Sequence, residues 1–316
     1  MVRKKDRLVT VYGGGGFIGR YVVQALFARG QRVRIVQRDP RRAFFLKPLA
    51  QLGQVQFAAA DITRPEMVAR TVQGSDAVIN LVGILRGNFA NIHRDGARHI
   101  AEAAAAAGAE ALVHVSAIGA DPESESRYAR SKGEGEAAVR AAFPSATIVR
   151  PSVAFGQEDN FINRFATMAR LLPFIPVLRG NWRMQPVHAA DLGRAIAIAA
   201  LDPRSHGGRT YELGGPQVVT MAELNRWIAE ATGRGSKGIA EIPDPIGRMI
   251  ARGSGWLPGA PITWDHWLMM QRDSVAADGA DGFAAFGITP SPMAAVAEGW
   301  LTAYRRTGRF AAKSPY

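Results

Sequence analysis

The sequence predicts an α/β protein built on a doubly wound parallel sheet, with a smaller C-terminal α/β lobe. Short apolar runs alternate with helical stretches through the first 150 residues, as in successive βαβ units. A glycine cluster follows the first apolar run, and the regular alternation ends after Pro151. With 316 residues, of which 47% are hydrophobic and 21% charged, the chain is long enough to bury one large core.

Each element follows from a local signal. Apolar runs predict the strands Leu8–Tyr12, Val33–Gln37, Val55–Ala58, Ala77–Val82, Ala111–Ser116 and Thr147–Arg150. Helical spacing predicts Gly19–Arg29, closed by Gly30, then Asp95–Ala107, closed by Gly108, and Ser126–Ala142. Beyond Pro151 we expect helices near Phe161–Leu171, Ala189–Ala200 and Met221–Ala231, and a strand at Thr210–Leu213.

Composition narrows the class of protein. The chain has no cysteine, which excludes disulfides, thiolate metal sites and a cysteine nucleophile. The net charge of +12 comes mostly from arginine side chains. Because these arginines are scattered along the chain, we attribute the charge to a bias in composition and not to a binding surface, and we expect no nucleic-acid partner. The basic stub Met1–Arg7 lacks a secretory pattern, and the longest apolar runs, such as Ala77–Leu85, are too short to cross a bilayer. A soluble or peripheral protein is expected.

The glycine cluster after the first strand points to a dinucleotide site. Gly13, Gly16 and Gly19 have the spacing G-x-x-G-x-x-G, with Phe17 and Ile18 between the last two glycines as further candidate cofactor-binding residues. Missing side chains let a pyrophosphate approach the backbone, and the helix N-terminus supplies N–H donors. The arrangement predicts a Rossmann-type NAD(P)-binding region over 1–155, with 156–316 as a C-terminal lobe interleaved with the same domain.

The end of the second strand favours NADPH over NAD(H). An NAD enzyme usually carries a carboxylate there, whereas this chain reads Gln37-Arg38-Asp39-Pro40-Arg41-Arg42. Arg38, together with Arg41 or Arg42, matches the extra phosphate of NADP. The alternative is a solvated basic helix start, and Asp39 keeps NAD(H) open as a cofactor.

A tyrosine and a lysine occupy one face of a predicted helix. Tyr128 and Lys132 are four residues apart, so the phenol and the ammonium lie one turn apart. A nearby ammonium favours the phenolate, which suits Tyr128 to proton transfer during hydride chemistry. Ser116, at the end of the fifth strand, is placed to bind the reacting oxygen. These three residues are the candidate catalytic group, whether or not it turns over a substrate.

Together these motifs resemble an extended or atypical short-chain dehydrogenase/reductase. The likeness includes Asp61-Ile62, Asn80-Leu81-Val82-Gly83 and Arg150-Pro151-Ser152-Val153, and it covers nearly the whole chain. It implies that Asp61 and Ile62 flank the adenine and that Asn80, Val82 and Gly83 line the ribose side. Pro151 and Val153 would contact the nicotinamide end.

A narrower resemblance is to the nucleotide-binding accessory subunit of respiratory complex I and its bacterial relatives. It rests on Gly19-Arg20-Tyr21-Val22-Val23, Asn163-Arg164-Phe165, Arg272-Asp273-Ser274-Val275 and Phe286-Gly287-Ile288-Thr289-Pro290. It implies tightly bound NADPH that serves assembly, complex I subunits as partners, and a peripheral place on the cytoplasmic side of the inner membrane. The competing interpretation is a freestanding NAD(P)-dependent reductase, epimerase or dehydratase.

Several residues depart from the common enzyme pattern. Tyr12 precedes the first glycine, and His93 stands where many extended enzymes have asparagine. Ala117 follows Ser116 in place of a second hydroxyl, which speaks against a sugar-nucleotide substrate. The histidines lack the spacing and carboxylate company of a metal site, so no metal is expected. Asp191 is expected to cap the following helix or lie in its first turn rather than act with His188.

Overall fold

The computed structural model describes residues 7–254 and 262–305, so most of the basic N-terminal stub lies outside the described residues. The chain divides into two compact units. The first unit comprises Met1–Pro151, Ala189–Leu213 and Ala276–Thr289, and the second comprises Ser152–His188, Gly214–Val275 and Pro290–Tyr316.

The first unit is a Rossmann-like fold, as predicted. Its sheet has seven parallel strands in the order β11-β6-β5-β4-β1-β2-β3. The strands are β1 (Leu8–Tyr12), β2 (Arg32–Gln37), β3 (Val55–Ala59), β4 (Ala77–Asn80), β5 (Ala111–Val115), β6 (Thr147–Pro151) and β11 (Thr210–Leu213). Strand order reverses between β1 and β4, and ligands of such sheets bind beyond the strand ends at that point.

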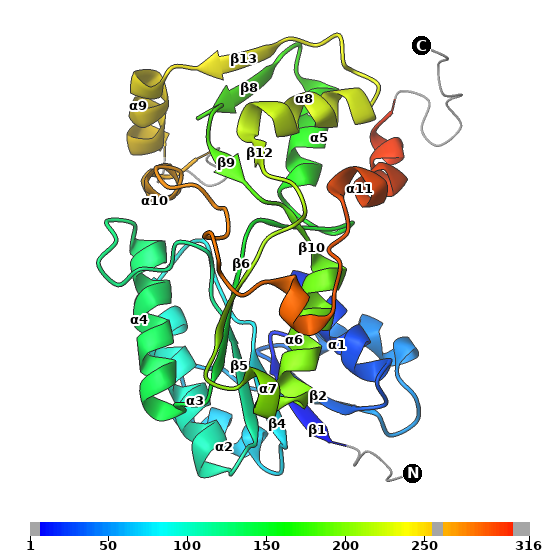
Figure 1. The fold of residues 1–316 in the computed structure, drawn as a ribbon, viewed down its shortest axis with the longest axis vertical. Coiled ribbons are helices and arrows are strands. Elements are labelled where there is room, and N and C mark those ends of the chain that lie inside the picture. Colours follow the sequence, from blue (N-terminus) through cyan, green and yellow to red (C-terminus); the bar gives the residue numbers. More distant parts are fainter. Residues whose placement is uncertain (1–6, 255–261, 306–316) are drawn as a thin grey trace. The chain divides into compact units, whose positions relative to one another are not determined.

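Helices cover both faces of this sheet. Figure 1 shows α1 (Phe17–Phe27) and α6 (Ala189–Leu201) on one face, and α2 (Pro65–Val72), α3 (Gly96–Ala106) and α4 (Arg127–Ala142) on the other. Strand β5 is buried along its whole length, as expected for a central parallel strand. Its residue Leu112 packs with Ile100 of α3 and Val139 of α4 in the core.

Local chemistry sets several element boundaries. Ser126 caps α4 by accepting a hydrogen bond from the amide of Ala129 at 3.2 Å. Strand β4 ends at Asn80, two residues earlier than predicted, because the Asn80 side chain accepts the amide of Val82 at 3.0 Å and turns the chain. Asp191 lies in the first turn of α6, as predicted, and it pairs there with Arg194 at 2.6 Å.

The second unit combines short strand pairs with helices. The pairs are β7 (Ala154–Phe155) with β10 (Val187–His188), β8 (Ile175–Leu178) with β13 (Ile239–Ile242), and β9 (Arg183–Met184) with β12 (Val219–Thr220). Its main core joins α5 (Ile162–Leu171), α8 (Met221–Ala231) and α11 (Met293–Leu301). A smaller cluster joins α9 (Asp244–Ser254) to α10 (Trp264–Met269), and Trp267 is buried within it.

Candidate cofactor-binding and catalytic site

The glycine loop joins β1 to α1 and is held by backbone bonds. Gly13 has φ +80°, and its amide donates to the carbonyl of Val36 at 2.9 Å. The amide of Gly16 donates a hydrogen bond to the carbonyl of Gly13, also at 2.9 Å. A Cβ on Gly19 would lie 2.2 Å from the Gly13 carbonyl oxygen, so only glycine allows this helix to start so close to the loop.

This loop fits the pyrophosphate of a dinucleotide. Helix α1 begins at Phe17 and Ile18 with no side-chain cap on Gly16 and no acidic residue in its first turn. The N–H groups of its first turn are therefore available to an anion. The helix starts at the carboxyl end of β1, beside the reversal of strand order, which is where a dinucleotide binds in such sheets.

The end of β2 lies beside the glycine loop. The Gln37 side chain accepts the Gly15 amide at 3.1 Å, so an uncharged amide stands where NAD enzymes place a carboxylate. Asp39 is held by Arg41 through two bonds of 2.9 and 3.1 Å, and this pairing lowers the pKa of the carboxyl. The Arg41 guanidinium is thus paired with Asp39, whereas the exposed Arg38 guanidinium forms no ion pair with any described residue.

Asp61 and Ile62 follow β3. Asp61 accepts hydrogen bonds from the amide and hydroxyl of Thr63 at 3.0 and 2.8 Å, and these bonds lower the pKa of its carboxyl. Arg38 contributes to the same lowering, which places the Arg38 guanidinium within electrostatic reach of Asp61. Ile62 is buried and packs in the core beside α3. Only the Asp61 side of the pair is open to a ligand.

The end of β4 meets the lysine of α4. A Cβ on Gly83 would lie 3.6 Å from Lys132 Nζ and 3.7 Å from His93 Nε2, so the chain passes close to both. Asn80 fixes this turn, since its Oδ1 accepts the Val82 amide and its Nδ2 reaches His114 Nδ1 at 3.1 Å. The structure thus brings Asn80, Gly83 and Lys132 together.

Lys132 is buried, and its ammonium donates to the carbonyl of Val115 at 2.9 Å. Burial lowers its pKa from 10.5 to about 8, and the nearby Glu136 carboxylate opposes that change. Ser116 follows Val115, and its buried hydroxyl has no hydrogen-bond partner among the described residues. Because a buried hydroxyl without a partner is costly, the Ser116 Oγ is suited to a ligand atom.

His93 is a site residue whose role the sequence did not predict. Its Nε2 accepts the Ile84 amide at 2.9 Å, which leaves the proton on Nδ1 to bond the Ser131 hydroxyl at 2.8 Å. Ser131 in turn donates to the Tyr128 carbonyl at 2.8 Å. Burial, helped by Lys132, lowers the pKa of His93 from 6.5 to about 3, so the ring is neutral.

Aromatic contacts orient Tyr128. The His93 and Tyr128 ring centroids are 5.4 Å apart with nearly perpendicular planes, and Phe89 stacks on His93 at 5.5 Å. Phe89 also meets Tyr128 edge to face at 5.9 Å. The Tyr128 ring is therefore fixed on two sides. In the sequence, the sole sign of these contacts around Tyr128 is that histidine stands at position 93, where many related enzymes have asparagine.

Two expected nicotinamide contacts fall in different units. Pro151 ends β6 in the first unit, and its carbonyl accepts the amide of Ile118 at 3.1 Å, next to the strand end that carries Ser116. Val153 belongs to the second unit, where it packs against the core that contains Phe155. The geometry of the first unit therefore includes Pro151 and not Val153.

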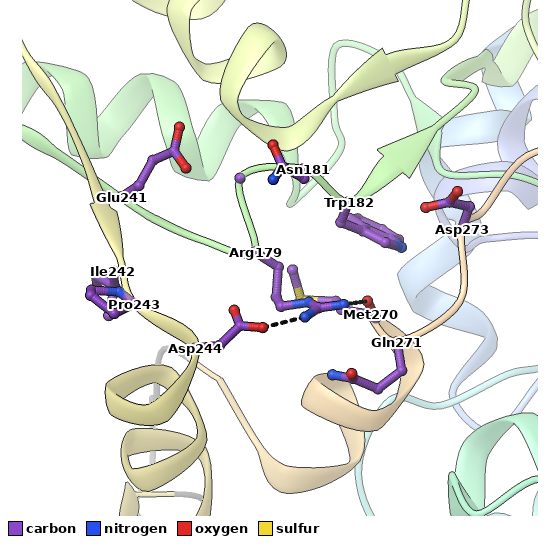
Figure 2. Close-up of a pocket in the computed structure, with 11 residues that line it drawn as sticks. Arg179, Asn181, Trp182, Glu241, Ile242, Pro243, Asp244, Met270, Gln271 and Asp273 are labelled. Carbon is purple, nitrogen blue, oxygen red and sulfur yellow. Dashed lines mark hydrogen bonds and ion pairs between the residues drawn. The ribbon is translucent and has the colours of Figure 1, made fainter.

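The second unit contains a cavity of about 430 Å³ between the β8–β9 turn, the end of β13 and the segment after α10. Figure 2 shows Arg179 reaching Asp244 and the carbonyl of Met270, with Trp182 and Glu241 on the wall. The lining carries three carboxylates and one guanidinium, a balance that disfavours an anionic ligand.

Two further features bear on function. Within the described ranges, no helix is both long enough and apolar enough to cross a membrane. The described residues also contain no group of three or more histidine, cysteine or acidic side chains able to hold a metal ion.

The parallel sheet and the glycine loop define a Rossmann-type fold of the NAD(P)H-binding class. A family profile described as NAD(P)H-binding matches residues 13–167. The solved triphenylmethane reductase of Citrobacter shares the fold, with a TM-score of 0.75 and 18% identity over 93% of this chain and 99% of that one. A dTDP-glucose 4,6-dehydratase from Streptomyces venezuelae, DesIV, also shares it, with a TM-score of 0.65 and 22% identity over 76% and 85%.

Sequence relatives narrow this class to one family. The mitochondrial 40 kDa subunit of NADH-ubiquinone oxidoreductase from Neurospora crassa is 31% identical over 94% of this chain and 79% of its own length. The alpha subcomplex subunit 9 of Rattus norvegicus NADH dehydrogenase is 34% identical over 90% and 77%. A ceramide reductase of Caulobacter vibrioides is 38% identical over 75% and 74%. The chain belongs to the family of the 40 kDa, or alpha subcomplex subunit 9, proteins of NADH-ubiquinone oxidoreductase, and the predicted resemblance is confirmed.

Proposed function

We propose that this chain is an NADPH-binding accessory subunit that supports the assembly and stability of respiratory complex I. The observation that carries the proposal is the similarity to complex I subunits over 94% and 90% of the chain, which spans both structural units. A likeness limited to the glycine loop would support nucleotide binding alone. Its place would be peripheral, on the cytoplasmic side of the inner membrane, held by other complex I subunits.

We infer that the cofactor is NADPH, and the residues at the end of β2 support this inference. An uncharged Gln37 replaces the usual carboxylate, and the exposed Arg38 lies within electrostatic reach of Asp61, on the adenosine side. A guanidinium there pairs with a 2′-phosphate, which NADH lacks. The amides of Phe17, Ile18 and Gly19 would hold the pyrophosphate, and Lys132 would hold the ribose next to Gly83.

A second candidate function is an NAD(P)H-dependent reductase. It is favoured by the Caulobacter relative and by the unpartnered Ser116 hydroxyl, which a structural cofactor does not need. When bound, the cofactor supplies a hydride. Ser116 would then orient a carbonyl oxygen, Tyr128 would give it a proton, and Lys132 would favour the phenolate left behind.

Purification from native membranes in mild detergent tests the two functions together. Complex I subunits with stoichiometric NADPH are expected for the accessory subunit, and a Tyr128→Phe variant should co-purify equally well. A chain found outside complex I, with exchangeable cofactor and ketone-dependent NADPH oxidation that Tyr128→Phe abolishes, would refute the accessory function and establish the reductase. A chain free of complex I and of nucleotide would refute both.

A further inference from the structure

Exposed apolar side chains gather in one short segment of the first unit. The described residues include eleven large apolar side chains that are strongly exposed, and four of them fall within nine residues: Phe44, Phe45, Leu49 and Leu52. Phe44 and Phe45 are each nearly half exposed, and Leu52 is fully exposed. Monomeric proteins seldom expose such a group of neighbours without using it to bind a partner.

Two buried side chains anchor this segment to the first unit. Residues Pro40–Leu49 form a 3-10 helix in which Ala43 and Leu46 are fully buried, so the side chains between them are turned outward. A Cβ on Gly15 would lie 2.8 Å from the Ala43 Cβ, which shows that the segment packs directly on the glycine loop. Its exposed groups are therefore held in place by the nucleotide-binding part of the fold.

Both phenylalanine rings are already oriented. The Arg20 guanidinium lies over the Phe45 ring, 4.8 Å from its centroid, and Phe44 meets Phe57 edge to face at 5.0 Å. Aromatic side chains fixed before binding lose little entropy when a partner covers them, and they are typical anchors of protein interfaces.

The charge around these side chains is positive. Arg42 and Lys47 are exposed and form no ion pair with any described residue, whereas Asp39 is already paired with Arg41. The next acidic residue along the chain is Asp61. A complementary partner therefore has an apolar centre with carboxylates at its rim.

We propose that the surface formed by Phe44, Phe45, Lys47, Leu49 and Leu52 is the docking site for an acidic-rimmed apolar face of another protein. A bilayer is disfavoured because the segment is not an amphipathic α-helix and its two rings are held against the fold. The inference deepens the proposed function, on which it rests for the identity of the partner, by naming the face that meets the complex.

Site-specific photo-crosslinking in the source cells tests this site. The photoreactive residue p-benzoylphenylalanine replaces Leu49 in the full chain, and a matched control places it at Val218, an exposed apolar residue of the second unit that has no exposed apolar neighbour in the sequence. We expect a discrete protein adduct from position 49 and none from position 218. The adducted peptide, identified by mass spectrometry, should be apolar and flanked by acidic residues. Combining Lys47→Glu with Phe45→Ser should reduce the adduct at least tenfold without loss of bound nucleotide, since Arg38 and Arg42 are untouched.

The outcomes separate the docking site from the proposed function. An adduct with a complex I subunit supports both. An adduct with another acidic protein, formed by a chain that does not co-purify with complex I, keeps the docking site and refutes the accessory function. Adducts with lipid alone, with a second copy of this chain, or with nothing overturn the docking site whenever the chain retains its nucleotide. They do so even if the chain co-purifies with complex I.

Discussion

Replacing Lys132 with methionine should stabilise the nucleotide-free protein at neutral pH. Burial holds the pKa of Lys132 at about 8 in the folded chain, against 10.5 for an exposed lysine, which corresponds to a cost of roughly 3 kcal/mol for burying the ammonium. The methionine leaves the carbonyl of Val115 without its donor, which costs about 1 to 2 kcal/mol. The net expectation is a gain of about 1 to 2 kcal/mol in the free energy of unfolding at pH 7.

The pH dependence of this effect has a definite sign. Below pH 8 both folded and unfolded chains carry the Lys132 proton, so the cost is fully present. Between pH 8 and 10.5 only the unfolded chain holds that proton, so the stability of the wild-type protein rises with pH. From pH 7.5 to 9.5 the rise due to Lys132 should be about 2 kcal/mol. The Lys132→Met variant should lack it.

Urea denaturation across this pH range measures the effect. The wild type, Lys132→Met and Lys47→Met are compared without nucleotide, the last removing an exposed ammonium as a control. The difference in the free energy of unfolding between the wild type and Lys132→Met should shrink as pH rises. Between the wild type and Lys47→Met no such pH-dependent difference is expected. A pH-independent difference, or a Lys132→Met variant less stable than the wild type at pH 7, would refute the reasoning. Nucleotide affinity should fall in that variant, because the same ammonium would bind the ribose.

Three further substitutions follow from the site. Gly19→Ala should lose about 3 kcal/mol by thermal denaturation and most of its nucleotide affinity, because the new Cβ would meet the Gly13 carbonyl oxygen, whereas unchanged melting would contradict this. Arg150→Met should lose about 3 kcal/mol in urea, because the buried Glu136 carboxylate loses its partner at 2.7 Å; Glu136→Gln in the same background should recover part of the loss. Arg38→Glu should weaken NADPH binding 10- to 100-fold in fluorescence titrations and leave NADH affinity unchanged, and an equal loss for both nucleotides would count against the phosphate assignment.

The predicted fold is confirmed because its signals are local and periodic. The strand from Leu8 to Tyr12 matches the observed β1, and α4 begins within one residue of the prediction at Ser126, which caps it. The observed α1 starts at Phe17, two residues before the predicted start at Gly19, because the Gly16 backbone already turns the chain into the helix. The 3-10 helix Pro40–Leu49 was missed, since it has no 3.6-residue periodicity and contains Pro48.

The sequence by itself determined the sheet class, the glycine loop and the pairing of Tyr128 with Lys132 on one helix. Each depends on residue types at fixed short spacings, which the backbone geometry of a strand, turn or helix converts directly into structure. Only the tertiary structure decided that Asp39 engages Arg41, that His93 holds Ser131, and that the ammonium of Lys132 is buried. The tertiary structure also decided which apolar side chains remain exposed to solvent. Burial and long-range hydrogen bonds depend on elements distant in sequence that meet when the sheet forms, and local periodicity carries no record of those neighbours.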